Sequence, residues 1–274
     1  SKVTFKDIEV DCSEENLEQV KNLVSSIEPL SDRGEGPGPD GDPRKKDGDV
    51  HAALLHENFD ETEWNPDIPL RKVCNSREVP SSVVTDLMEH QHEGFDWMIS
   101  SWESGLPGIL NADDQGLGKT LQTLSFLSWL KDNMSSKDST HRGPVLIVAP
   151  TSLLKNWEAE VSKHLDASSL GVLIKAYGSF LKGLKREGSK GTDIKDGTEK
   201  LNFDEINSAI KKGNGHEFWV LTTYRTLANY QHSFRTVNFS VVVFDEIQNI
   251  KNPASFNSHS ARSVVADFRI GLTG

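Results

Sequence analysis

The chain has 274 residues, a hydrophobic content of 35% and a formal net charge of −11. This length allows one or two domains. No apolar run approaches the ~20 residues of a membrane span, and the first residues lack the basic start and apolar core of a signal peptide. The two cysteines, Cys12 and Cys74, give neither a zinc spacing nor a disulfide framework. We therefore expect no membrane association and a cytoplasmic location, or a nuclear one in a eukaryote.

The acidity is unevenly distributed along the chain. Residues 1–86 hold 20 acidic and 10 basic residues, a net charge of −10, whereas residues 87–274 hold 21 acidic and 20 basic residues, a net charge of −1. A nearly neutral second part can carry a local basic groove. The overall charge therefore does not exclude a nucleic-acid partner.

The N-terminal region reads as a small unit that precedes the main domain. Residues 3–10 predict a strand, and a helix is expected to follow with Ser13 at its start. Residues 31–43 hold four Gly and three Pro, which predicts a flexible linker near 31–50. We expect an acidic N-terminal region over 1–85 and a second domain over 86–274.

The stretch from 108 to 124, GILNADDQGLGKTLQTL, predicts a strand, a tight turn and the start of a helix. Gly116 and Gly118 permit a sharp turn whose backbone N–H groups point at an anion, and the helix adds the positive end of its dipole. Lys119 can reach the outer phosphates of a nucleotide, and the Thr120 hydroxyl can bind the accompanying Mg²⁺. The stretch therefore predicts a P-loop that holds a nucleoside triphosphate.

Strands and helices alternate regularly after residue 86. Several strands are continuous apolar runs, which is typical of parallel strands buried on both faces. This alternation predicts an α/β fold of three layers, a mainly parallel sheet flanked by helices. The expected strands are 108–111, 145–149, 172–176, 219–222, 241–244 and 269–272, and the expected helices are 86–103, 119–132, 152–165, about 224–230 and 256–266.

Residues 181–215 interrupt this alternation. Residues 181–200 contain six basic residues, four acidic residues and four glycines. This composition favours a mobile, solvated insertion, with a DNA-contacting loop as the alternative.

A second chemical motif, VVVFDEIQ, spans residues 241–248. It places two carboxylates at the end of a buried strand, where parallel sheets bind ligands. Asp245 can hold Mg²⁺, usually through a water, and Glu246 can orient and deprotonate the attacking water. On its own the pair could merely cap a turn, but after a P-loop it predicts catalysis of ATP hydrolysis by Lys119, Asp245 and Glu246, with the metal held by Thr120 and Asp245.

The motifs DDQGLGKT, VAPTSLLKNWEAE, LTTY, DEIQNIKN and GLTG occur in the order seen in the Swi/Snf family of DNA-translocating ATPases, within the second helicase superfamily. The resemblance covers about residues 87–274 and implies the first of two RecA-like lobes, in a bacterial-type member. It implies ATP and Mg²⁺ as cofactors and double-stranded DNA as the partner.

The resemblance also implies roles for individual residues, with DNA contacts directed to phosphate and sugar and therefore independent of sequence. Gln91 would read adenine, and Leu153, Leu154 and Trp157 would pack. Nucleotide contacts are implied for Asp114, Gln115, Gly116, Leu117, Gly118, Lys119, Thr120 and Leu121, DNA contacts for Ser152, Lys155, Asn156, Ser179, Thr222 and Thr223, and coupling of the nucleotide to movement for Gln248 and Thr273.

The sequence departs from the usual patterns at several positions. Asp113 replaces the first P-loop Gly, Asp114 and Gln115 stand where the family more often has Glu and Met, and the acidic box ends in Ile-Gln rather than Ala-His. The chain stops at Gly274, inside a coupling motif, so we expect the second lobe and its arginine to be missing. Because such an arginine can contribute ~10³–10⁵ in rate, weak nucleotide binding and poor hydrolysis are expected.

Three alternatives remain open from the sequence. One is a strand-separating helicase or an RNA-dependent ATPase of the same superfamily. Another is a protein-docking module that uses residues 1–80, and a third is a P-loop that no longer binds or hydrolyses ATP. We expect a monomer in each case.

Overall fold

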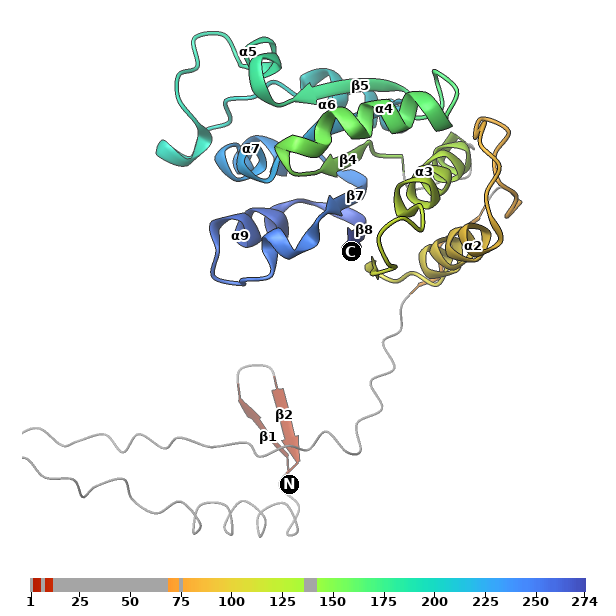
Figure 1. The fold of residues 1–274 in the computed structure, drawn as a ribbon. Coiled ribbons are helices and arrows are strands. Elements are labelled where there is room, and N and C mark those ends of the chain that lie inside the picture. The colour runs from red at the N-terminus through yellow and green to blue at the C-terminus, as the bar shows by residue number, and fades with distance from the viewer. Residues whose placement is uncertain (1, 6–7, 12–68, 74–75, 136–141) are drawn as a thin grey trace, which may run out of the picture. The chain divides into compact units, whose positions relative to one another are not determined.

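The computed structural model describes residues 2–5, 8–11, 69–73, 76–135 and 142–274 (Figure 1). The chain consists of two compact units, residues 1–66 and residues 67–274. The predicted helix from Ser13 and the predicted linker near 31–50 lie outside the described residues.

In the first unit, strand β1 (Lys2–Phe5) pairs antiparallel with β2 (Ile8–Asp11). The prediction of one strand over residues 3–10 is therefore wrong. Apolar and polar residues alternate on both sides of the break, so the pattern does not reveal where the chain reverses.

The second unit is built on a sheet of six parallel strands in the order β3-β8-β7-β4-β6-β5. All six expected strands are present, and the predicted three-layer α/β fold is confirmed. The strands are β3 (Gly108–Asn111), β4 (Val145–Val148), β5 (Val172–Ala176), β6 (Phe218–Thr222), β7 (Phe239–Asp245) and β8 (Ala266–Leu272).

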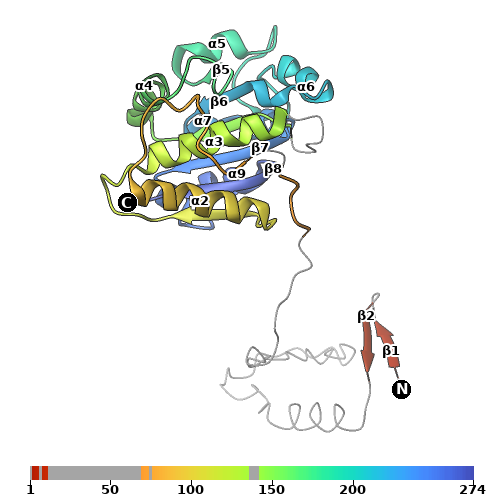
Figure 2. The ribbon, with the colours of Figure 1, turned by 90° about the vertical axis from the view of Figure 1, so that its right-hand side faces the viewer.

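Helices cover both faces of this sheet (Figure 1, Figure 2). Residues of α2 (Glu89–Glu103), α3 (Lys119–Ser135) and α4 (Leu154–His164) join the buried cluster on one face. The cluster on the other face takes residues from α6 (Asp204–Lys211), α7 (Tyr224–Asn229), α8 (Gln231–Arg235) and α9 (Phe256–Ser263). In the described part of the chain, no helix has the length and apolar character of a membrane span.

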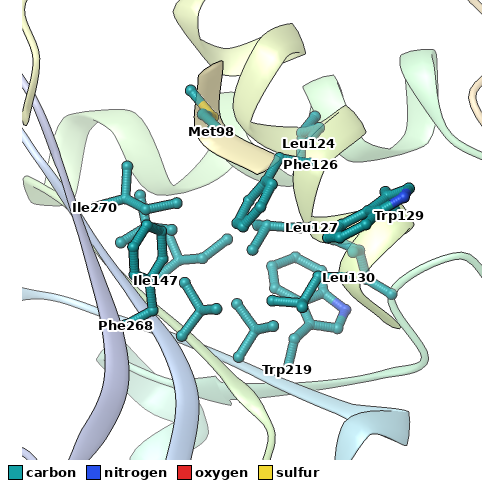
Figure 3. Close-up of a cluster of buried hydrophobic side chains, with 14 of the residues drawn as sticks. Met98, Leu124, Phe126, Leu127, Trp129, Leu130, Ile147, Trp219, Phe268 and Ile270 are labelled. Carbon is teal, nitrogen blue, oxygen red and sulfur yellow. The ribbon is translucent and has the colours of Figure 1, made fainter. Parts of the chain in front are cut away.

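Side chains alternate between the two faces of the sheet along the central strands, so each strand contributes residues to both cores. Val145 and Ile147 of β4 belong to the cluster under α3, whereas Leu146 and Val148 belong to the opposite cluster. Figure 3 shows leucines of α3 facing Ile147 and the residues of β8. Each such side chain contributes about 1.5–3 kcal/mol of stability by leaving water, and together they fix α3, and hence the P-loop, against the sheet.

Within the second unit, residues 69–73 and 76–87 pack against the helices and the sheet. The Arg71 guanidinium donates to the backbone oxygens of Trp102 and Asp267, each at 2.7 Å. Val83 forms an isolated antiparallel bridge with Leu165. Most of this segment precedes residue 86, where the sequence predicts the start of the second domain. The segment contains prolines and shows neither helical nor strand periodicity, so the sequence does not predict its packing.

The segment 181–215 is only partly the solvated insertion that its composition favours. Most of residues 181–200 are exposed, and Asp193 is the buried residue among them, whereas residues after 200 pack against the sheet. The segment contains α5 (Leu181–Leu184) and α6, and Leu201, Phe203 and Ile206 are at most 2% exposed within the second core cluster. Charged residues and glycines dominate the first twenty positions, but these apolar residues anchor the segment to the sheet.

Candidate functional site

The P-loop lies between β3 and the start of α3. Gly116 and Gly118 have positive φ angles of 89° and 79°, a conformation that glycine adopts without steric cost. At Gly118 a Cβ atom would also lie 2.2 Å from Nε2 of Gln91. The Lys119 Nζ donates to the carbonyl oxygens of Asp113 (2.6 Å) and Asp114 (3.0 Å), so the loop itself holds the ammonium group at the mouth of the turn.

The first box carboxylate, Asp245, ends strand β7 and accepts a hydrogen bond on each oxygen. The Trp157 indole Nε1 donates to Oδ2 at 2.8 Å, and the Glu246 backbone N–H donates to Oδ1 at 3.0 Å. Burial raises the pKa of Asp245, whereas the Trp157 hydrogen bond and the charge of Lys119 lower it and the Glu246 charge raises it. The net direction is upward, which a nearby cation would oppose.

The second box carboxylate, Glu246, has a left-handed backbone with φ 53°, and in the described part of the chain no other residue except glycine has a positive φ. Such a conformation costs about 1–3 kcal/mol and is typical of functional sites. Gln248 Nε2 donates to the Glu246 carboxylate, and Thr273 Oγ1 donates to Gln248 Oε1 at 3.2 Å. The structure thus joins the predicted water-orienting residue to both predicted coupling residues in one chain of hydrogen bonds.

A cavity of about 490 Å³ brings the two motifs together. Thr120 and Asp245 both line it, although they are far apart in the sequence, and Asn156 and Lys163 of α4 close one side. Of the predicted nucleotide contacts, Gln91, Gln115, Gly116, Gly118, Lys119, Thr120 and Leu121 line the cavity, and Asp114 and Leu117 do not.

The donor set of this cavity suits magnesium bound together with a nucleotide. Among the described residues, no cluster of three or more His, Cys, Asp or Glu could hold a metal by itself. Magnesium is commonly bound by one or two protein oxygens, water and substrate phosphates. A Thr120 hydroxyl and an Asp245 carboxylate that line the same cavity fit that mode.

Both polar atoms of the Gln91 side-chain amide form hydrogen bonds with backbone groups of the protein. Its Oε1 accepts from the Met88 N–H at 3.0 Å, and its Nε2 donates to the Leu117 carbonyl at 3.3 Å. The side chain is 7% exposed. It ties the start of α2 to the P-loop, and its predicted reading of adenine remains a prediction.

The predicted DNA contacts follow three neighbouring strands. Because β4, β6 and β5 are adjacent and parallel, their carboxyl ends lie at one edge of the sheet. Ser152, Lys155, Asn156 and Ser179 are exposed near that edge.

Two of the predicted DNA contacts are turned inward. The Thr222 hydroxyl is fully buried and donates to the Ala176 carbonyl at 2.7 Å. Thr223 is 7% exposed, and its hydroxyl oxygen accepts from the Thr226 N–H at 3.0 Å as the cap of α7. Both hydroxyls therefore serve the fold in this structure, which does not bring them to the surface with the other four residues.

Sequence reasoning missed a bracing network behind this edge. Lys175 Nζ lies 2.5 Å from a Glu158 oxygen, and the Tyr177 hydroxyl donates to the other. Burial, together with the hydrogen bond and charge of Glu158, raises the pKa of Tyr177 to about 12. The network fixes the start of α4 to the end of β5. It joins side chains from two elements, so no local pattern could have revealed it.

Comparison with known proteins identifies the family. A family profile described as "SNF2-related domain" matches residues 90–274. The chain belongs to the SNF2-related family. The resemblance to Swi/Snf proteins found in the sequence is thereby confirmed.

Individual relatives of this SNF2-related chain agree. It is 36% identical over 233 residues to the Zorya protein ZorD of Escherichia coli O139:H28, covering 80% of the chain and 20% of ZorD. It is 33% identical over 201 residues to Switch 2 of Arabidopsis thaliana, covering 72% of the chain and 20% of that protein. The chain thus spans about a fifth of the length of these relatives.

A solved structure with a similar fold is the Sulfolobus solfataricus SWI2/SNF2 ATPase core in complex with dsDNA. It aligns with a TM-score of 0.52 and 30% identity, over 73% of this chain and 34% of that one. The same core domain described without DNA aligns with a TM-score of 0.50 and 27% identity, over 76% of this chain and 36% of that one.

Proposed function

We propose that this SNF2-related chain is the ATP-binding lobe of an ATPase that depends on double-stranded DNA. The observation that carries the proposal is the single cavity lined by Lys119 and Thr120 from the P-loop and by Asp245 and Glu246 from β7. These are the donor and acceptor types that a Mg²⁺–triphosphate needs, and two distant segments supply them at one place.

Each residue then has a defined task. Lys119 leaves the Asp113 and Asp114 carbonyls and holds the outer phosphates, while Thr120 and Asp245 would hold Mg²⁺. The metal, when bound, neutralises charge on the phosphoryl group that is transferred. Glu246 orients the attacking water and accepts its proton.

The proposed partner follows from the exposed side of the sheet edge. Ser152, Lys155, Asn156 and Ser179 offer neutral and cationic donors of the kind that contact phosphate and sugar. The Sulfolobus solfataricus neighbour is described as a complex with dsDNA, which supports duplex DNA over RNA or a single strand. Stimulation of hydrolysis by RNA or by single-stranded DNA alone would favour the helicase alternative.

We also propose that the 274-residue chain alone hydrolyses ATP slowly. No arginine is among the described residues that line the cavity, and an arginine that stabilises the transferring phosphoryl group contributes about 10³–10⁵ in rate. Rapid turnover by this chain with duplex DNA would contradict that proposal.

The deciding experiment compares nucleotide binding and hydrolysis in Lys119→Ala and in the wild type. Loss of the ammonium group should weaken binding of Mg²⁺-ATP at least tenfold and abolish DNA-stimulated hydrolysis. Lys211→Ala, which removes an exposed lysine of α6 that does not line the cavity, is the matched control and should behave as wild type. Equal affinity in the wild type and in Lys119→Ala would instead favour a docking module with an inactive P-loop.

A further inference from the structure

The indole of Trp157 links two parts of the proposed machinery. Its Nε1 donates to Oδ2 of Asp245 at 2.8 Å, and the side chain is 2% exposed. Position 157 lies in the first turn of α4, immediately after the exposed Lys155 and Asn156. The element that carries the proposed DNA contacts therefore also carries a hydrogen-bond donor to the proposed metal ligand.

The hydrogen bond determines how the Asp245 carboxylate is presented. Oδ1 is held by the N–H of Glu246, Oδ2 by the indole, and the Asp245 backbone oxygen accepts from the Tyr224 hydroxyl at 2.7 Å. The Glu246 N–H directly follows β7, and the Tyr224 hydroxyl contacts the last residue of β7. The indole, in contrast, comes from α4. A small shift of α4 would change the partner of Oδ2 and leave the other two bonds in place.

α4 is itself braced toward the proposed DNA edge. Glu158, which follows Trp157 in the sequence, accepts hydrogen bonds from Lys175 of β5 and from Tyr177. The exposed Ser179 lies two residues after Tyr177. A phosphate that contacts Lys155 and Ser179 would act on both ends of this brace. Because Trp157 and Glu158 are consecutive residues of α4, a displacement of α4 at this brace would also move the indole.

We propose that Trp157 is a positioning residue that orients Asp245 for Mg²⁺ and transmits DNA contact at α4 to the metal ligand. The inference rests on the proposed function. Residues that orient a metal ligand without touching the metal commonly change metal affinity by about 10–100-fold when replaced. The sequence alone suggests only packing for this tryptophan, because nothing local shows which atom its N–H meets.

The first test measures metal dependence without catalysis. Binding of the fluorescent nucleotide mant-ATP to the chain is titrated with Mg²⁺ in the wild type and in Trp157→Phe, which keeps an aromatic ring and removes the N–H. The Mg²⁺ concentration for half-maximal binding should rise about tenfold. In an Asp245→Ala background, which has no acceptor for the indole N–H, the same substitution should add less than about twofold, because the two residues act through one bond.

Trp129→Phe is the matched control. The Trp129 indole is also buried and donates to a backbone oxygen, that of Ser76, at 2.7 Å, but it does not line the cavity. The substitution Trp129→Phe should leave the Mg²⁺ concentration for half-maximal mant-ATP binding within about twofold of wild type. Equal midpoints for Trp157→Phe and Trp129→Phe would overturn the proposal, as would a full effect of Trp157→Phe in the Asp245→Ala background.

The second test follows the indole directly. The Nε1–H resonance of Trp157, assigned by its loss in Trp157→Phe or, if that variant does not fold, in Trp157→His, should shift when Mg²⁺-ADP or duplex DNA is added to the wild type. The Trp129 resonance should stay unchanged. If the Trp157 resonance shifts with neither ligand while mant-ATP still binds, the proposed transmission from α4 to Asp245 is refuted. Absence of mant-ATP binding to the wild type would instead refute the proposed function.

Discussion

The P-loop and acidic box differ sharply from the segment 181–215 in how their polar groups are used. In the cavity, Lys119 donates to two carbonyls of its own loop, and Glu246 has a left-handed backbone conformation. In the segment 181–215, the buried Asp193 accepts from the Lys200 N–H at 2.9 Å and from the Ser233 N–H at 2.7 Å. The first region keeps charge available for a ligand, and the second uses its charge to hold the fold.

This difference separates function from stability within one domain. Substitutions of Lys119 or Glu246 should reduce turnover and leave the free energy of unfolding nearly unchanged, because these two side chains are only partly buried and lie outside the core. Substitutions of Asp193 should lower the free energy of unfolding, because they remove the acceptor of the buried Ser233 N–H and one of the two acceptors of the Lys200 N–H.

The largest effect is expected at the cavity. Glu246→Gln keeps the size of the side chain but removes the base that accepts a proton from water, so the slow hydrolysis proposed for this chain with duplex DNA should fall by at least a further factor of about 100. Binding of mant-ATP and the denaturation midpoint should remain within error of wild type. Steady-state ATPase assays, equilibrium binding and chemical denaturation measure the three quantities on the same preparation.

A parallel loss of stability in Glu246→Gln would break the comparison, since it would show that the box carboxylate also supports the fold. The matched control is Glu205→Gln, on the exposed start of α6. It changes the same functional group outside the cavity and should alter neither activity nor stability.

An intermediate effect is expected at Asp193, which is 0% exposed. Replacement by Ala leaves the N–H groups of Lys200 and Ser233 without the carboxylate, which should lower the free energy of unfolding by about 2–3 kcal/mol. Urea denaturation measures the loss, and hydrogen exchange should locate it in residues 193–201 and in α8. At urea concentrations below the unfolding transition, Asp193→Ala should still bind nucleotide at saturating Mg²⁺-ATP.

Asp193→Asn is the informative control, because it retains one acceptor oxygen and should lose less stability than Asp193→Ala. An unfolding free energy equal to wild type in Asp193→Ala would show that this segment is as loosely held as its composition suggests.

Much of the fold was predictable from local patterns. The apolar run at 145–149 and the run at 241–244 mark strands because burial on both faces demands continuous hydrophobicity. Gly116, Gly118 and Lys119 mark the P-loop because only certain residues permit that turn. These signals lie within a few adjacent residues, so spacing alone is sufficient to read them.

The contacts that could not be predicted join elements distant in the sequence. The hydroxyl of Thr222 bonds to a neighbouring strand, and the indole of Trp157 meets the end of β7. The carboxylate of Asp193 reaches forty residues along the chain to Ser233. Each depends on which strands become neighbours, and that order, β3-β8-β7-β4-β6-β5, is not written in any local motif.

The smallest expected effect concerns Asp196, an exposed carboxylate three residues after Asp193. Its oxygens accept from Lys200 Nζ at 2.7 Å and from the hydroxyl and N–H of Thr198. The Lys200 hydrogen bond, followed by those from Thr198, lowers the pKa of Asp196 from 3.8 to about 2. Because the folded state favours the ionised form, its contribution to stability is present above pH 3.8 and is lost as the pH falls through about 2.

An NMR titration of the Asp196 carboxyl should therefore give a midpoint near 2 in the wild type. Lys200→Met, which keeps most of the stem and removes the charge, should move this midpoint toward 3.8. Asp196→Asn should flatten the pH dependence of stability between these values and converge with the wild type at the acid end. A wild-type midpoint of 3.8 would show that the surface pair does not persist in solution, leaving the buried carboxylate of Asp193 to hold this part of the segment.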